Sequence, residues 1–158
     1  MNYGFVRIAA GIPSVKVGDC KYNAQQMESL IAQAEGKGVE IICFPELSVT
    51  AYTCGDLFSQ QLLLDEAEMA LISLLDFTRS LDIISIIGIP VVCNGTLLNC
   101  AAVIQRGKLL GLIPKTFLPN YKEFYEQRWF TSADVVTDAN VLICGQQVPL
   151  NRNIIFNI

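Results

Sequence analysis

The sequence contains no histidine in its 158 residues. Within this chain, that absence excludes Ser-His-Asp and Cys-His nucleophiles, histidine metal sites and acid–base catalysis by an imidazole. Any proton transfer must therefore use Glu, Asp, Lys, Tyr or Cys side chains. A carboxylate paired with a lysine is the first kind of site to look for.

Basic runs and long apolar stretches are also missing. The net charge is −4, and without a basic patch we expect no nucleic-acid partner. The longest apolar runs, such as residues 83–92, have about ten residues, too few to cross a bilayer. The first residues lack the basic start and long apolar stretch of a signal peptide. We therefore expect a cytoplasmic protein that does not bind a membrane.

Cysteine pairs with C-x-x-C spacing are absent, although the chain has six cysteines. They lie mostly in apolar contexts, which predicts buried, reduced thiols rather than disulfides. Apolar residues make up 52% of the chain and charged residues 16%, which is apolar for a free-standing domain. We expect this apolar surface to be covered, either by a further part of the polypeptide or in a homo-oligomer.

Hydrophobic periodicity predicts an α/β domain with a mixed sheet covered by helices. Helices are expected at residues 23–36 and 60–80, and a polar loop at 48–58. Strands are expected at residues 3–10, 39–44, 83–93, 97–105, 108–113, 141–144, 147–149 and 153–158. Residues 94–95 read Asn-Gly, a strong hairpin-turn signal. Because the last strand would leave an unprotected edge, we expect residues 1–158 to be a truncated domain.

Glu46 and Lys115 each follow a strand-like apolar run, directly after a proline that ends the strand. The ends of strands are where open α/β sheets present their reactive groups. A carboxylate there can act as a general base, and an ammonium group can stabilise an oxyanion. On position alone, Glu46 could equally be a helix N-terminal residue and Lys115 a solvated lysine.

Three sequence blocks, in this order, resemble the carbon–nitrogen hydrolase (nitrilase) superfamily. Residues 44–47 read Phe-Pro-Glu-Leu, residues 113–121 read Ile-Pro-Lys-Thr-Phe-Leu-Pro-Asn-Tyr, and residues 124–130 read Phe-Tyr-Glu-Gln-Arg-Trp-Phe. The run from 118 to 130 resembles, more specifically, the N-terminal glutaminase domain of glutamine-dependent NAD synthetases. The resemblance extends through essentially the whole chain.

The resemblance implies a four-layer αββα sandwich with mixed sheets and a Glu-Lys-Cys triad, without a metal. Matched to this sequence, it makes Glu46 the general base and Lys115 the cation at the oxyanion. It makes Glu126 the second glutamate, which supports Lys115, and Tyr121 a residue of the glutamine pocket. The cysteine of this family follows a later strand, in a block that residues 1–158 do not contain, and Cys144 lacks its acidic and aromatic neighbours.

Alternatives for single residues stay open. Glu126 could pair with Lys122 on a helix surface, and Glu123 could take the supporting role because it is closer to Lys115 in sequence. Cys54 is the thiol within this chain to check as a nucleophile.

The implied activity is hydrolysis of the glutamine amide, with the ammonia used for ATP-dependent amidation of nicotinic acid adenine dinucleotide to NAD. The ATP and Mg²⁺ for that step are expected in a synthetase domain downstream, not in residues 1–158, which form a partial carbon–nitrogen hydrolase domain. Two rival interpretations are a stand-alone nitrilase-type amidase or carbamoylase, and a non-catalytic oligomerising interaction module.

Overall fold

The computed structural model describes residues 4–136 and 139–157. In chain order its elements are β1 (Ile8–Ala10), α1 (Cys20–Glu35), β2 (Ile41–Cys43), the 3₁₀ helix η1 (Tyr52–Ser59), α2 (Gln61–Phe77), η2 (Thr78–Ser80), β3 (Ile84–Cys93), β4 (Thr96–Gln105), β5 (Lys108–Pro114), η3 (Glu126–Arg128), η4 (Ala133–Val135), β6 (Ala139–Ile143) and β7 (Gln146–Leu150).

The strands form one mixed sheet in the order β1-β2-β3-β4-β5-β7-β6. β1, β2 and β3 are parallel, because connections that contain α1 and α2 return the chain to the same edge. β3, β4 and β5 are antiparallel neighbours, while β7 is parallel to β5 and antiparallel to β6. β5 therefore runs in the same direction as β2, and the C-terminal ends of both lie at one edge of the sheet.

Two-residue turns join the central strands. Asn94 and Gly95 have φ angles of 51° and 74°, and Arg106 and Gly107 have 48° and 73°. Positive φ at both central residues is the geometry that matches the twist of an antiparallel pair. The hairpin turn predicted at residues 94–95 is confirmed.

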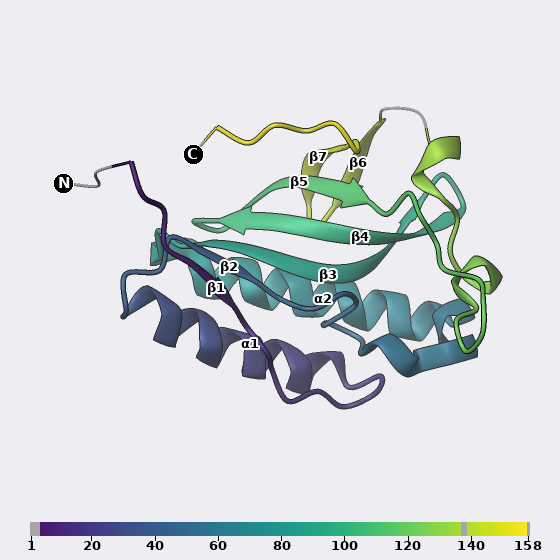
Figure 1. Ribbon diagram of the computed structural model, residues 1–158, viewed down its shortest axis with the longest axis horizontal. Helices are drawn as coiled ribbons and strands as arrows, with labels where there is room; N and C mark the ends of the chain where they lie inside the picture. Colours follow the sequence, from purple (N-terminus) through teal and green to yellow (C-terminus); the bar gives the residue numbers. More distant parts are fainter. Residues whose placement is uncertain (1–3, 137–138, 158) are drawn as a thin grey trace.

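Helices α1 and α2 lie side by side under one face of the sheet (Figure 1). The carboxylate of Asp19 caps α1 by accepting a hydrogen bond from the backbone N–H of Tyr22. The predicted α/β class is confirmed. The described residues form one layer of helices and one sheet, which are two of the four layers of an αββα sandwich. Burial of apolar side chains between these two layers stabilises the fold. Fully buried side chains of this core include Met27, Ile31, Leu71, Leu74 and Ile87.

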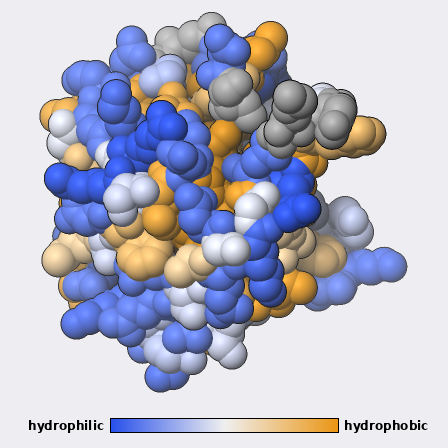
Figure 2. All heavy atoms as spheres, turned by 90° about the vertical axis from the view of Figure 1, so that its left-hand side faces the viewer, coloured by the Kyte–Doolittle hydropathy of each residue, from blue (hydrophilic) through white to orange (hydrophobic). Residues whose placement is uncertain are grey.

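Apolar side chains on the rest of the surface are only partly covered. Ile8 on β1 and Cys43 on β2 are exposed, whereas Gly111 on β5 is covered by Ile154 and Phe156. Viewed from the left-hand side of Figure 1, apolar atoms gather in the centre between hydrophilic side chains (Figure 2). In the part of the chain that the structure describes, neither α1 nor α2 is long and apolar enough to cross a bilayer.

Three sequence-based predictions are corrected. Residues 153–157 form no strand, because the segment lies over β5, with Ile154 and Phe156 against Gly111, instead of pairing with a neighbouring strand; residue 158 lies outside the described residues. The strand predicted at residues 3–10 is limited to Ile8–Ala10, and residue 3 is not described. The segment predicted as a loop at 48–58 contains η1, which is kinked at Gly55, where φ is 58°.

Candidate active site

The candidate site lies where β2 and β5 end. Glu46 follows β2, and Lys115 directly follows Pro114, the last residue of β5. The backbone N–H of Lys115 donates to the carbonyl of Asn99 on β4 at 2.8 Å, and its carbonyl accepts from the N–H of Ala133 at 3.0 Å. These two bonds fix the direction in which the lysine leaves the sheet. Because β2 and β5 run the same way, both side chains reach the same edge, as the sequence predicts.

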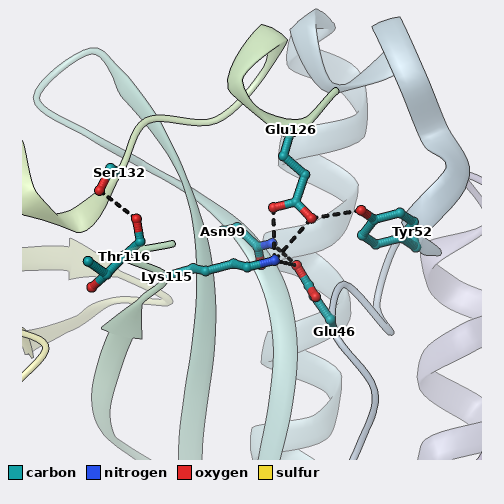
Figure 3. A network of polar contacts seen from close by, with 7 residues as sticks. All are labelled: Glu46, Tyr52, Asn99, Lys115, Thr116, Glu126 and Ser132. Carbon is teal, nitrogen blue, oxygen red and sulfur yellow. Dashed lines mark hydrogen bonds and ion pairs between the residues drawn. The ribbon is translucent and has the colours of Figure 1, made fainter. Parts of the chain in front are cut away.

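Lys115 links two glutamates (Figure 3). Its Nζ lies 2.6 Å from Oε1 of Glu46, and 3.0 and 2.9 Å from Oε1 and Oε2 of Glu126. The Glu126 side chain is 3% exposed, that of Lys115 27% and that of Glu46 39%. A buried carboxylate needs a charged partner, and Lys115 is that partner for Glu126. Glu46 is the carboxylate that solvent or a substrate can reach.

Glu126 also accepts a hydrogen bond that the sequence analysis missed. The hydroxyl of Tyr52, at the start of η1, donates to its Oε1 at 2.7 Å. The backbone N–H of Glu126 in turn donates to the carbonyl of Pro119 at 3.2 Å. Nothing in the spacing of Tyr52 signals this contact, because the two residues meet across 74 positions of sequence.

Asn99 is the second residue that sequence reasoning missed. It is 3% exposed on β4, and its Nδ2 donates to Oε1 of Glu46. A signal for it does exist in the sequence, since Asn99 is the one amide within the apolar run Leu-Leu-Asn-Cys-Ala-Ala-Val. A buried amide in such a run requires a polar partner.

The charges of the site reinforce one another. Burial alone would lower the pKa of Lys115, but its hydrogen bonds to Glu46 and Glu126 and their negative charges outweigh burial and raise that pKa. Burial, followed by the hydrogen bond to Glu126 and its charge, raises the pKa of Tyr52. At neutral pH Lys115 is therefore an ammonium group and Tyr52 a neutral donor.

Tyr121 lies beside these residues rather than among them. Its side chain is exposed and lines an open hollow of about 930 Å³ formed by the segments that follow Lys115, with Phe117, Pro119, Gln127 and Asp134 among the other lining residues. The Tyr121 ring contacts Phe124 at 5.8 Å between centroids, and Phe124 contacts Tyr52 at 6.5 Å. Aromatic contacts thus connect this hollow to the Lys115 network.

The structure shows which glutamate of this segment pairs with Lys115. The ion pair of Glu126 is with Lys115, while Glu123 is exposed. Arg128 instead forms a two-point ion pair with Asp56, at 2.8 and 3.2 Å. This pairing, followed by a hydrogen bond from the Trp129 indole, lowers the pKa of Asp56 to about 2. The contact ties η1 to the segment that carries Glu126.

The cysteines of the described chain stand apart from this network. Cys54 is buried and its thiol donates to the carbonyl of Thr50 at 3.0 Å. Cys144 lies in the turn between β6 and β7, and burial, with the nearby charge of Glu68, raises its pKa to about 12. Within the described residues, neither thiol is hydrogen-bonded to Glu46 or Lys115. In residues 4–136 and 139–157 no group of three or more His, Cys, Asp or Glu side chains is arranged to hold a metal ion.

Residues 7–148 match the family described as carbon-nitrogen hydrolase. The match covers most of the chain and includes the segments after β2 and β5 that carry Glu46 and Lys115. The chain belongs to the carbon–nitrogen hydrolase family.

Individual relatives show which members of the family the chain is similar to. The glutamine-dependent NAD(+) synthetase of Mycobacterium bovis is 33% identical over 155 residues, which are 98% of this chain and 23% of the relative. A glutamine-dependent NAD(+) synthetase structure from Cytophaga hutchinsonii superposes with a TM-score of 0.88 at 27% identity, covering 97% of this chain and 26% of that one. An amidase from Nesterenkonia sp., 19% identical over 92% of this chain and 54% of its own, shares the fold with a TM-score of 0.68. The chain thus spans about a quarter of the length of the synthetases it matches.

Proposed function

We propose that this chain is part of the glutaminase domain of a glutamine-dependent NAD synthetase. In this proposal Glu46 is the general base, Lys115 stabilises the oxyanion, and Glu126 keeps Lys115 charged and in place. Tyr121 contributes to the glutamine pocket. The observation that carries the proposal is the position of the Lys115 ammonium group, held between one buried and one accessible carboxylate at the end of the sheet.

The chemistry follows from these groups. A cysteine outside this sequence loses its proton to Glu46 and its thiolate attacks the side-chain carbonyl of glutamine. The tetrahedral oxyanion that forms is stabilised by the Lys115 ammonium group. Glu46 then gives the proton to the leaving nitrogen, which departs as ammonia. Water, deprotonated by Glu46, attacks the thioester carbonyl, and the C–S bond breaks to release glutamate. Glu46 returns its proton to the departing thiolate, so that the cysteine is regenerated and the net reaction consumes one water for each glutamine.

The rest of the proposal concerns the complete polypeptide. The ammonia is used by an ATP- and Mg²⁺-dependent synthetase domain of the same polypeptide to amidate nicotinic acid adenine dinucleotide. The complete protein acts in the cytoplasm as a homo-oligomer. The similarity to glutamine-dependent NAD(+) synthetases supports the synthetase step. Exposed apolar side chains, such as Ile8 at 66% exposure, support the assembly, because such surface is usually covered.

The test compares two nitrogen sources in the complete polypeptide that contains this chain. NAD formation is measured with glutamine and, separately, with ammonium chloride, for the wild type, Glu46→Gln and Lys115→Ala. We expect glutamine-driven synthesis to fall about 10²- to 10⁴-fold in both variants, because a general base and an oxyanion donor are lost. Synthesis from ammonium should remain at the wild-type rate.

Glu123→Gln is the matched control, since it neutralises an exposed glutamate near Glu126 without touching Lys115. It should leave both activities unchanged. An equal loss of the glutamine-driven and ammonium-driven activities in Glu46→Gln would contradict the assignment, because it would place Glu46 outside amide hydrolysis.

A further inference from the structure

We infer that Asn99 is a positioning residue for the general base, an inference that rests on the proposed function of Glu46. Asn99 contacts both members of the pair at the strand ends. Its backbone carbonyl accepts from the N–H of Lys115 at 2.8 Å, and its side-chain Nδ2 donates to the Glu46 carboxylate. Asn99 therefore fixes both the backbone position of Lys115 and the orientation of the Glu46 carboxylate.

Chemistry fixes which end of the amide faces Glu46. A carboxylate accepts hydrogen bonds and has none to donate, so the NH₂ group of Asn99 must face it. The side chain is 3% exposed and extends from a central strand that is hydrogen-bonded on both sides. The position of Asn99 is thus fixed by the hydrogen bonds of the sheet and does not depend on Glu46 or Lys115.

Both donors to Glu46 reach the same oxygen. Nζ of Lys115 lies 2.6 Å from Oε1, and Nδ2 of Asn99 also bonds to Oε1, as Figure 3 shows. In the described part of the chain, these are the side-chain hydrogen bonds of the Glu46 carboxylate. Because Oε1 accepts both of these hydrogen bonds, the lone pairs of Oε2 remain available to take a proton from the nucleophile.

A single donor would leave the carboxylate free to rotate about its last bond. Lys115 alone could bind either oxygen or share its protons between them, because an ammonium group donates in three directions. The added amide bond selects one orientation. Proton transfer depends steeply on such alignment, so the contribution of Asn99 should be seen in turnover and not in glutamine binding.

The experiment uses the complete polypeptide with Asn99→Asp and Asn99→Ala. Asn99→Asp keeps the size of the side chain but replaces the donor with a second carboxylate beside Glu46. We expect glutamine-driven kcat to fall about 10- to 100-fold in both variants, with KM for glutamine within about twofold. Ammonium-driven synthesis should stay near the wild-type rate in both variants. The midpoint of thermal unfolding should change little in Asn99→Ala and should fall in Asn99→Asp, where a second carboxylate is buried.

Gln105→Glu is the matched control, because it makes the same amide-to-carboxylate change at the other end of β4, where Gln105 bonds to the carbonyl of Asp82. It should leave kcat unchanged.

A second readout is the rate of covalent labelling by a glutamine-mimicking electrophile. In a Glu46→Gln background, Asn99→Ala should add no further loss of labelling rate, because Asn99 acts through Glu46.

Three other results of these experiments would contradict the role of Asn99. Wild-type kcat in Asn99→Asp, or an additive loss in the double variant, would overturn the inference. Unfolding of both Asn99 variants would overturn it too, because Asn99 would then serve the sheet and not the base. If Glu46→Gln itself retained glutamine-driven activity, the proposed function would fail, whereas an inactive Glu46→Gln beside active Asn99 variants would reject the inference about Asn99 alone.

Discussion

Gly88 on β3 lies directly against the backbone of Leu47, the residue that follows Glu46. A Cβ atom at position 88 would overlap the Leu47 nitrogen and lie 2.6 Å from the carbonyl oxygen of Pro45. The carbonyl of Gly88 also accepts from the N–H of Val49 at 3.1 Å. The absence of a side chain at Gly88 thus determines how closely the segment with Glu46 approaches the sheet.

Gly88→Ala should therefore displace Glu46. We expect a loss of about 1–3 kcal/mol in the free energy of unfolding, since backbone rather than a flexible side chain must move. Glutamine-driven NAD formation should fall at least tenfold, because a shift of about 1 Å in a catalytic group is costly. Urea unfolding and steady-state kinetics of the complete polypeptide measure both effects.

Gly36→Ala is the control for that change, because Gly36 has a helical φ of −62°. A Cβ there would lie 3.4 Å from the Ala32 carbonyl oxygen and 3.8 Å from that of Gln33. It should alter neither stability nor activity appreciably. Wild-type activity in Gly88→Ala would show that the Glu46 segment can move without harm.

Tyr52→Phe should weaken the hold on Glu126. The change removes one hydrogen bond to a buried carboxylate, which costs about 1 kcal/mol after allowance for the partial exposure of Tyr52. We expect a fall of at most about tenfold in glutamine-driven kcat, because Lys115 still holds both oxygens of Glu126. Tyr125→Phe, at an exposed neighbouring tyrosine, is the control. A loss as large as that of Lys115→Ala would instead mean that Tyr52 touches the substrate.

Stability should decline at alkaline pH through Lys115 and Tyr52. Folding raises the pKa of Lys115 above 10.5 and that of Tyr52 above 10.0. A raised pKa means that the unfolded chain loses the proton first, so the stabilisation is complete below these values and is lost as the pH rises past them. Urea unfolding between pH 8 and 11 should show a shallower decline in Lys115→Met and in Tyr52→Phe. Identical slopes in wild type and Lys115→Met would exclude this linkage.

Cys54→Ala and Cys144→Ala should each keep glutamine-driven activity within about twofold of wild type. Burial raises the pKa of both thiols, so almost no thiolate exists near neutral pH, and the thiolate is the nucleophilic form. Assays of the single variants and their double variant provide the measurement. Inactivation by either substitution, with the fold intact, would place the nucleophile inside this chain.

The strand ends with their charged residues could be predicted because they depend on local signals. Pro45 and Pro114 end the apolar runs, and a charged residue follows each directly. The residues alone left open whether Glu126 pairs with Lys115 or with Lys122, and only the resemblance to the superfamily favoured Lys115. The pairing depends on how residues 116–130 fold back toward the strand ends, which no local pattern indicates. Tyr52 could not be found for the same reason.

The wrong strand at residues 153–157 has a different cause. A short apolar run, here Ile154-Ile155-Phe156, fits a strand pattern equally well when it covers a sheet instead of pairing with a neighbouring strand. Gly111 offers the space for Ile154 and Phe156, and no periodicity in the sequence distinguishes that packing from pairing. The first strand was also predicted too long. Its apolar residues fit a strand pattern, but only Ile8–Ala10 pair with β2, and Ile8 remains exposed.

The hairpin of β3 and β4 also implies an order of assembly. Its two strands are joined by the turn at Asn94 and Gly95, so Gly88 pairs with Ala101 and Asn99 with Pro90 through local contacts. Such contacts form early at little entropic cost. Glu46 must reach Asn99 across 53 positions of sequence. We therefore expect the Asn99 amide and the surface at Gly88 to be in place before the carboxylate arrives, so that Glu46 becomes partly buried only where a donor already stands.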